Sequence, residues 1–424
     1  MDHTERCQIS GPLARVLRIS SLLCVVPLQL TPLRKQTQCI SLSGAQKANS
    51  GRLSYIPTIS RKRQIIGYVL VFVILTLQVI NLCKRLIFES ESSKPLPKVC
   101  LTVITILSST SILVTGFDGV NNMKRYMSYI NKLEKINQKL ESSLLDSQIK
   151  GSGFIIWGFI SAFILLFGCH LFFKEFITWT SNKHGRSDFI AFAVDAGLLC
   201  KHMFNVMLCM QFVFLVCAVN VTLRTQNDRL RNLIFKLKLY DAMKTKNVAN
   251  AHTTIRRLYR AHVSICEVVR SIDEGEGALV AILLLSKIME CTESFCRLIS
   301  ISYAPLDEWT NRKFVNLLVT LIWASFKGIL IVLMAEHCHK TQEEFQTAQI
   351  HVSHLMCASA DREFRDELRR FYNQVVVKTP AFSPLGICVL TRQLLAGIIG
   401  GIATLLAIVL QFHLIDSDRL RPPL

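Results

Sequence analysis

The chain has 424 residues, of which 50% are hydrophobic and only 19% charged, and its formal net charge is +19. Soluble domains carry about a quarter charged residues, so this composition is apolar and basic together. Its hydrophobicity excludes a disordered chain, and uncharged runs such as residues 65–83 exclude a soluble nucleic-acid-binding protein. Runs of that length cross the hydrocarbon core of a bilayer, which is about 30 Å thick. The sequence therefore predicts a polytopic membrane protein.

Seven stretches are long and apolar enough to cross a membrane, and each is expected to be helical because lipid offers the backbone no hydrogen-bond partner. They are residues 65–83, 99–120, 153–173, 189–219, 277–303, 314–335 and 385–412. The predicted fold class is an all-α membrane protein with seven transmembrane helices. Upstream, the apolar run 19–30 is interrupted by Pro27 and followed by Pro32, so we expect a cytoplasmic or interfacial helix rather than a signal peptide.

The loops between these spans differ in kind. Loops 121–152, 223–276 and 336–384 are long, and apolar residues recur in them at three- and four-residue steps, as in Met127, Ile130 and Leu133. This periodicity predicts amphipathic helices. Loops 84–98, 174–188 and 304–313 are short. We therefore expect a helical domain on one side of the membrane and only short links on the other.

The basic residues are distributed unevenly between these two sides. The N-terminal arm and the long loops carry 33 Lys and Arg residues, whereas the short loops and the C-terminal tail carry 11. The positive-inside rule places the richer side in the cytoplasm. We expect a cytoplasmic arm at 1–64, helices 1 to 6 over 65–335, a cytoplasmic loop at 336–384, helix 7 at 385–412 and an extracellular tail at 413–424.

Several functional classes fit this pattern poorly. A G-protein-coupled receptor also has seven spans, but its N-terminus lies outside. Transporters usually contain internal repeats, and no matching halves are evident. The sequence has no Walker loop, GxSxG, HExxH or paired CxxC motif, so we predict no enzymatic activity. His351 and His354, close to His337 and His339, are more simply interpreted as loop residues than as a metal site.

The seventh span ends in TLLAIVLQF, residues 404–412. This segment resembles the C-terminal signature of insect gustatory receptors, which is Thr-Tyr, five hydrophobic residues and Gln-Phe. Thr404, Gln411 and Phe412 match, whereas Leu405 stands where the family usually has Tyr. The run leading into it from Phe371 looks like the family's last helix and its lead-in, and residues 12–27 resemble the family's N-terminal segment. With the spans, orientation and helical loops, the resemblance covers nearly the whole chain.

Resemblance to that family implies a ligand-gated cation channel of four subunits, either identical or mixed with other gustatory receptors. It places the channel in the plasma membrane of gustatory receptor neurons. The last helix of each subunit would line a central pore, the cytoplasmic helical loops would form an anchor domain that holds the tetramer, and a small-molecule tastant would bind in an outward-facing cavity of each bundle. Membrane lipids are the other expected partner. We expect no cofactor, no metal and no nucleic-acid partner.

The same resemblance assigns the pore and gate to Thr404, Ile408, Gln411 and Phe412. Ile408 and Gln411 are three residues apart and therefore share one face of a helix. A ring of Ile408 side chains would close the pore by dewetting, and a ring of Gln411 side chains would hydrogen-bond hydrated cations. The alternative is that Gln411 merely ends the span at the membrane interface.

Polar and aromatic residues within the spans are the candidates for the ligand cavity, which needs an apolar lining with a few convergent polar groups. Charges at such depth are costly and should pair locally or face water. Lys287 shares one helical stripe of the fifth span with Glu290, Glu293 and Arg297, and the alternative for these four residues is a structural charge ladder. For the others the alternative is a satisfied interior group. The candidates are Asp195, Glu290, Glu293, Arg297, Trp323 and Lys327.

The signature also bears on the class of tastant. The family's sugar-receptor branch tends to carry an acidic residue after Thr-Tyr, whereas this chain has Leu406. We therefore expect bitter or other plant-derived small molecules. The alternatives are a sugar-responsive receptor and an odorant-receptor-like subunit that conducts only with a partner. A transporter or a G-protein-coupled receptor fits least well.

Overall fold

The computed structural model describes residues 17, 18, 21, 28–32, 55–88, 95–140, 158, 161, 162, 165, 168, 189–243, 248–302, 311–359, 361–377 and 379–419. The long elements in this part of the chain are helices, and the other elements are a two-stranded ribbon and one short 3₁₀ helix. In chain order they are β1 (Leu28–Pro32), β2 (Tyr55–Ile59), α2 (Arg61–Phe88), α3 (Pro95–Lys139), α5 (Phe189–Met243), α6 (Val248–Ser302), α7 (Asn311–Ala358), α8 (Arg362–Val377), the 3₁₀ helix η2 (Pro384–Gly386) and α9 (Arg392–Arg419). The predicted all-α class is confirmed.

The predicted helix over residues 19–30 is wrong at its C-terminal end. There the chain forms β1, which pairs antiparallel with β2 so that Leu28 lies opposite Ile59 and Pro32 opposite Tyr55. The prolines on either side explain the change, because a proline lacks the N–H that a continuing helix requires. The ribbon ends one residue before α2 begins.

Every predicted span that falls within the described residues lies in a helix, except that residues 385–391 of the seventh span precede α9. By length and composition α2, α5, α7 and α9 are each able to cross a membrane. So is α3, if its two halves Thr102–Gly116 and Asp118–Lys139, bent by 71°, form one span. The second half of α6 carries Lys287, Glu290, Glu293 and Arg297 and is less apolar. The predicted span 153–173 lies outside the described residues except at a few isolated positions.

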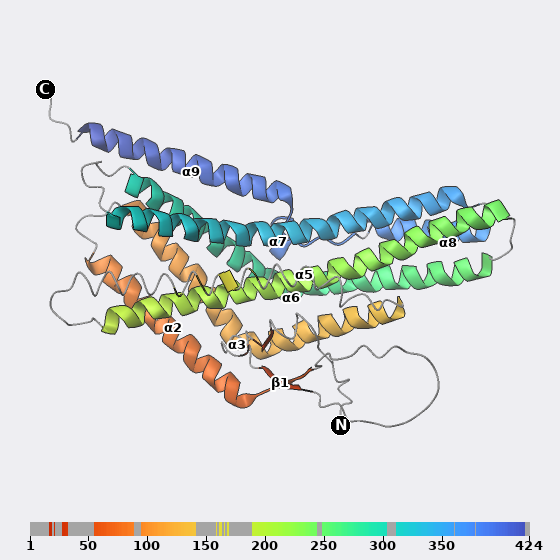
Figure 1. Ribbon diagram of the computed structural model, residues 1–424, viewed down its shortest axis with the longest axis horizontal. Coiled ribbons are helices and arrows are strands. Elements are labelled where there is room, and N and C mark those ends of the chain that lie inside the picture. Colours follow the sequence, from red (N-terminus) through yellow and green to blue (C-terminus); the bar gives the residue numbers. More distant parts are fainter. Residues whose placement is uncertain are drawn as a thin grey trace.

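The loop helices continue directly from the spans. Helices α5, α6 and α7 run side by side along the length of the molecule (Figure 1), and each contains a predicted span and a predicted loop helix. Helix α8 packs against α7 and α6 at one end, which we call the anchor end. We call the opposite end the bundle end. It contains α2 and the first half of α3, and α9 runs along one of its edges.

Helix α9 begins at Arg392, later than the predicted start of the seventh span at residue 385. The reason is η2, in which Leu385 has a φ of 57° and Gly386 a φ of 68°. A left-handed conformation costs a residue with a Cβ atom about 1–2 kcal/mol, so Leu385 must be held there by its surroundings. The chain therefore turns before it enters α9.

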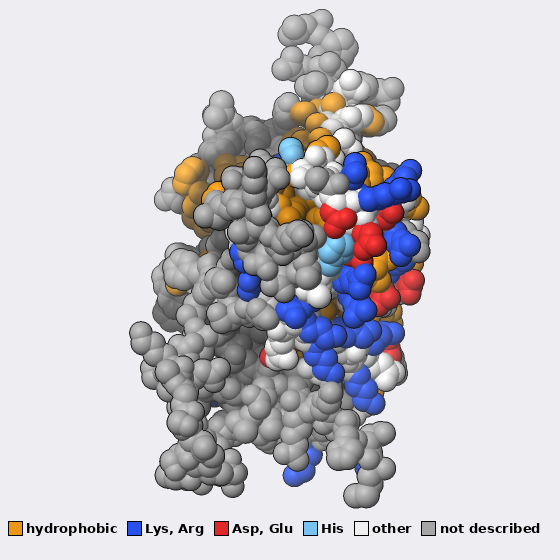
Figure 2. Space-filling view, turned by 90° about the vertical axis from the view of Figure 1, so that its right-hand side faces the viewer, with side chains coloured by type: hydrophobic (Ala, Val, Ile, Leu, Met, Phe, Trp, Pro, Cys, Tyr) orange, Lys and Arg blue, Asp and Glu red, His pale blue; other side chains and the backbone are white. Residues whose placement is uncertain are grey.

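The anchor end has a core of its own. Four residues of α8, spaced by four, three and four, are buried on one face: Phe364, Leu368, Phe371 and Val375. Burying each such side chain stabilises the fold by about 1.5–3 kcal/mol. Arg365 and Arg369 lie on the exposed face, and Figure 2 shows Lys, Arg, Asp, Glu and His side chains gathered over the described surface at this end. This end is thus suited to water rather than to lipid.

His262 of α6 is the central polar residue of the anchor core and has no exposed surface. Its ring lies edge-on to Phe345 and Phe371, with ring centroids 5.6 and 5.5 Å away, and its Nδ1 is 3.1 Å from the amide nitrogen of Gln226. Burial lowers the pKa of His262 to about 4. The folded protein therefore holds this imidazole neutral at pH 7.

Mild acid is expected to destabilise the anchor core through His262. Its pKa is lower in the folded than in the unfolded chain, where it is about 6.5, so its contribution is fully present above pH 6.5 and is lost as the pH falls through 6.5 toward 4. The loss reaches about 1.4 kcal/mol by pH 5.5. The melting temperature of the detergent-solubilised receptor is measured at pH 7.5 and at pH 5.5. We expect it to fall further between these two pH values in the wild type than in the His262→Gln variant. Equal falls would contradict this role.

Candidate functional site

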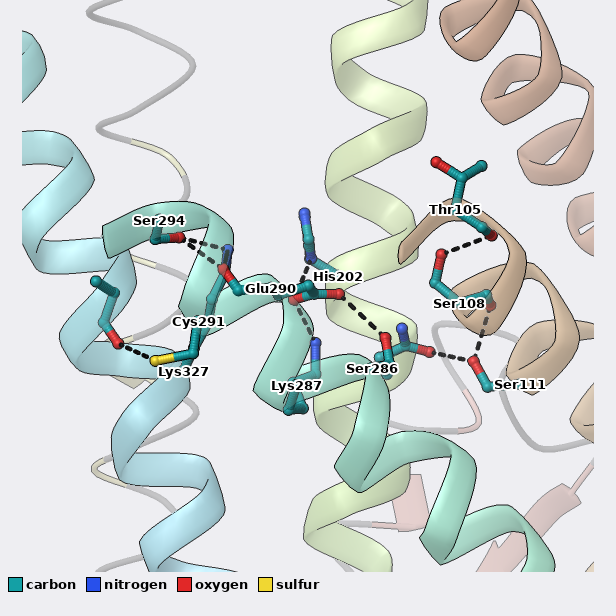
Figure 3. Close-up of polar contacts among 12 residues, drawn as sticks. Thr105, Ser108, Ser111, His202, Ser286, Lys287, Glu290, Cys291, Ser294 and Lys327 are labelled. Carbon is teal, nitrogen blue, oxygen red and sulfur yellow. Dashed lines mark hydrogen bonds and ion pairs between the residues drawn. The ribbon is translucent and has the colours of Figure 1, made fainter. Parts of the chain in front are cut away.

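Helices α3, α5, α6 and α7 bring polar side chains together inside the bundle end (Figure 3). We call this group the polar cluster. It contains hydroxyl, amide, imidazole, ammonium and carboxylate groups in a largely buried setting. Its members are Ser111, Lys201, His202, Asn205, Ser286, Lys287, Glu290, Ser294 and Lys327.

Glu290 is the centre of the polar cluster and is 1% exposed. Its Oε2 accepts from Lys287 Nζ at 2.9 Å and lies 3.6 Å from Nδ1 of His202, while Ser286 Oγ donates to Oε1 at 3.4 Å. Lys287 is equally buried. A buried charge is tolerated when it is paired and hydrogen-bonded. Glu290 and Lys287, three residues apart on α6, meet that requirement for each other.

Lys327 joins α7 to α6 at this level. Its Nζ donates to the main-chain carbonyl of Glu290 at 3.3 Å and to Ser294 Oγ at 3.1 Å. Next to it, Cys291 Sγ of α6 lies 3.9 Å from the carbonyl oxygen of Ala324 on α7. The spacing of α6 and α7 is therefore set by polar contacts between them within the bundle.

Positive charge exceeds negative charge inside the cluster. Lys201 on α5 is 5% exposed, and three lysines, Lys201, Lys287 and Lys327, interact electrostatically with the buried carboxylate of Glu290. An ammonium group is a donor only and cannot accept a hydrogen bond. The ammonium groups of the cluster can therefore donate to oxygen acceptors such as hydroxyl, ether or carbonyl groups.

An aromatic surface borders the polar cluster. The rings of His202 and Trp323 lie 6.1 Å apart between centroids and are tilted by 35°. Trp323 also contacts Phe326 edge-on at 6.2 Å. His202 and Trp323 are only partly buried. Aromatic surface with a few converging polar groups is the usual make-up of a small-molecule site.

The structure brings three of the predicted cavity residues together and separates others. Glu290, Lys327 and Trp323 lie in or beside the polar cluster, as described above. Glu293 and Arg297 instead pair with each other along α6, with side chains 20% and 52% exposed. That pair matches the alternative of a structural charge ladder. The side chain of Asp195 lies outside the described residues.

Sequence reasoning did not single out Lys201, Asn205 or the serines of the cluster. Lys201 is a charged residue within a predicted span, so the signal that singled out Lys287 and Lys327 applied to it as well. Asn205 accepts from Ser111 Oγ of α3 at 3.1 Å. Nothing in the sequence distinguishes that pair, because small polar residues are common in transmembrane helices and the contact depends on how α3 and α5 are rotated.

Helix α9 presents the predicted pore residues away from the bundle. No part of its apolar window is buried within the chain. Thr404, Ile408 and Gln411 are all exposed, and the Thr404 hydroxyl donates to the carbonyl of Gly400 on its own helix at 2.9 Å. The side chain of Phe412 lies outside the described residues. Ile408, 45% exposed, therefore needs lipid or protein to cover it.

A family model described as 7tm chemosensory receptor matches residues 48–416 of the chain. The chain belongs to this family. The predicted membership in the insect gustatory and olfactory receptor group is thereby confirmed. Chemosensory receptors are not enzymes, so the family also accounts for the lack of a catalytic motif.

The fold and one curated relative agree with the family assignment. The structure of the insect olfactory receptor OR5 from Machilis hrabei is similar with a TM-score of 0.61 at 13% identity, covering 94% of this chain and 97% of that chain. The same receptor in complex with eugenol gives a TM-score of 0.59. The gustatory receptor for sugar taste 43a of Drosophila melanogaster is 24% identical over 166 residues. That match covers 39% of this chain and only 37% of the relative.

Proposed function

We propose that this chemosensory receptor is a gustatory receptor in which a small tastant opens a non-selective cation pore lined by α9. The observation that carries the proposal is the exposure of α9. A membrane-length apolar helix of which no part is buried within its own chain is explained if other subunits surround it. We propose a tetramer, made of copies of this chain or of this chain with other gustatory receptors. It would lie in the plasma membrane of gustatory receptor neurons.

The proposed orientation has the N-terminus in the cytoplasm and the C-terminus outside. The charged anchor end and the excess of basic residues in the long loops both support this direction. The polar cluster then lies in the outer half of the bundle, where a dissolved tastant has access to it. The anchor end would hold the subunits together on the cytoplasmic side.

We propose bitter or other plant-derived molecules as the ligands. The Trp323 and His202 rings suit a flat or aromatic ligand, and the lysines of the polar cluster suit one with oxygen acceptors. The complex of the similar olfactory receptor with eugenol supports a small-molecule ligand. Leu405 and Leu406 at the signature are consistent with a receptor outside the sugar branch.

A sugar-responsive receptor is the second candidate, because the Drosophila relative is named for sugar taste. Trp323 provides a ring on which the C–H face of a sugar would stack, and the cluster provides donors for its hydroxyl groups. Sugars and alkaloids therefore need to be compared directly in one assay.

The test is expression in a cell without chemosensory receptors, with currents recorded during application of quinine, caffeine, sucrose and glucose. We expect an alkaloid to evoke a cation current that persists when G-proteins are blocked. A response to sucrose or glucose alone would favour the sugar receptor. Silence until a second receptor is expressed would favour the odorant-receptor-like subunit. Uptake without conductance, or loss of current under G-protein block, would contradict a channel.

Trp323→Ala is expected to raise the half-maximal concentration of the active compound about tenfold, because a stacked aromatic contact and its buried area are lost. The reversal potential of the current should not change, since Trp323 is not one of the predicted pore residues of α9. Phe314→Ala is the matched control, an exposed aromatic residue on the same helix. Equal potency of the two variants would contradict a cavity at Trp323.

A further inference from the structure

The segment between α8 and α9 is a closed turn at the base of α9. We call residues 379–391 the elbow. Its ends are joined by a hydrogen bond from the Leu390 N–H to the Phe382 carbonyl at 2.9 Å, and both side chains are buried. Phe382 packs edge-on against Phe212 of α5, with ring centroids 6.0 Å apart. The elbow is therefore fixed to the bundle rather than loosely connected to it.

A first link runs from the elbow to α6. Asp273 accepts from the Ser383 N–H at 2.9 Å through Oδ1, and its Oδ2 lies 3.4 Å from the Ser383 hydroxyl. Ser383 immediately precedes η2, the left-handed part of the elbow. Asp273 thus holds the elbow at the point where the chain direction changes.

A second link runs from the first residue of α9 to α7. Arg392 donates to both carboxylate oxygens of Glu336, through Nε at 2.9 Å and Nη2 at 2.7 Å. Its remaining nitrogen, Nη1, lies 3.4 Å from Glu343, about two helical turns further along α7. A two-pronged Arg–carboxylate contact fixes orientation as well as distance. The base of α9 is thereby fixed to α7.

Both links lie on helices that also form the polar cluster. Asp273 precedes Glu290 on α6 by about 25 Å at 1.5 Å per residue, and Glu336 follows Lys327 on α7 by about 14 Å. Both helices run without a break between these points. The contacts of Lys327 with Glu290 and Ser294 set the spacing of α6 and α7 at the cluster. A ligand that changes this spacing must therefore displace the elbow and the base of α9 relative to each other.

We infer that the Arg392–Glu336 and Asp273–Ser383 contacts transmit ligand binding from the polar cluster to α9. This inference rests on the proposed function. Asp273, Glu336 and Arg392 are positioning residues, because none of them touches the ligand or the predicted pore face. Two links from two helices define how the base of α9 turns when α6 and α7 shift.

The test exchanges the charges of the second link. Arg392→Glu, Glu336→Arg and the double exchange are expressed in a Glu343→Gln background, because Glu343 would repel a carboxylate at position 392. Evoked current is measured with whichever of quinine, caffeine, sucrose and glucose activates the wild type, and is divided by surface receptor from biotinylation. We expect each single change to lower this current about tenfold and the double exchange to restore most of it. The control is Arg370→Glu, a reversal at an exposed arginine of α8.

The first link has its own matched pair. Asn at position 273 keeps an oxygen that accepts from the Ser383 N–H, whereas Ala removes it. Asp273→Ala is therefore expected to lower the evoked current per surface receptor about fivefold, and Asp273→Asn to leave it near the wild type. A role in folding alone would lower surface receptor without changing the current each receptor carries.

Two results would overturn the inference, and they differ. The links would be excluded, and the proposed function left standing, if the wild type gives currents and the Arg392, Glu336 and Asp273 variants give the same currents. Failure of the double exchange to restore any current would have the same meaning. A wild type silent to all four compounds would contradict the proposed function and, with it, the transmission described here.

Discussion

Glu290→Ala is expected to destabilise the receptor by about 3–5 kcal/mol, because it leaves Lys287 as a buried charge without its partner. Oε2 of Glu290 is 2.9 Å from Lys287 Nζ, and both side chains are almost fully buried. Lys201 and Lys327 nearby also lose the only buried carboxylate of the polar cluster. Surface receptor should fall to a small fraction of the wild type, measured by biotinylation. The melting temperature in detergent should fall as well.

Two comparisons separate this effect from a general intolerance of substitution on α6. Glu293→Ala removes a carboxylate one turn away whose partner, Arg297, is half exposed, so it should cost only about 0.2–1 kcal/mol. The double change Lys287→Met with Glu290→Met replaces the ion pair by apolar side chains of similar length and should recover much of the lost stability. Equal surface levels of the Glu290→Ala and Glu293→Ala receptors would contradict a buried ion pair at Glu290.

Ile408→Ala is expected to raise the cation current in the absence of ligand about tenfold. Ile408 is an exposed apolar residue of α9, and a ring of four such side chains would keep water out of a closed pore. Replacing them by methyl groups widens the constriction and lets it wet, which favours the conducting state by about 1.4 kcal/mol. Whole-cell current before ligand application, divided by surface receptor, measures the effect.

The control for Ile408 is Ile399→Ala, which removes the same kind of exposed side chain from the same helix. We expect it to leave the ligand-free current unchanged, because it does not share the face of Ile408 and Gln411. The order of potency of the tested compounds should also be the same in both variants. An Ile408→Ala receptor with altered ligand preference and an unaltered ligand-free current would place this residue in a binding site.

The helices were predictable because lipid leaves the backbone no alternative, so every long apolar run had to be helical. Their lengths were not. Hydropathy falls at residue 219, where the predicted fourth span ends, yet α5 continues to Met243 because the residues beyond it remain good helix formers with a buried face. The start of α9 was missed for a related reason. The apolar residues 385–390 resemble the span that follows, and only Pro384 and Gly386 indicate the elbow.

The candidate site was predictable where charge alone identifies a residue. Glu290 and Lys327 stand out as charges within apolar spans, and both lie in the polar cluster. Charge does not say which residues meet, since that depends on the rotation of neighbouring helices about their axes. Glu293 and Arg297 therefore shared a predicted stripe with Glu290 although they lie apart from the cluster, and the sequence does not show that Arg392 would reach Glu336.

The proposal that α9 lines a cation pore is tested most directly by placing a positive charge at Gln411. With the active compound applied, single-channel conductance and reversal potential are compared between the wild type, Gln411→Lys and Gln346→Lys, an exposed glutamine at the anchor end. Four lysines around the pore would repel cations, so we predict that Gln411→Lys lowers cation conductance about tenfold and shifts the reversal potential toward that of anions, while Gln346→Lys matches the wild type. Unchanged conductance and reversal potential in a Gln411→Lys receptor present at the surface would contradict a pore along this face of α9.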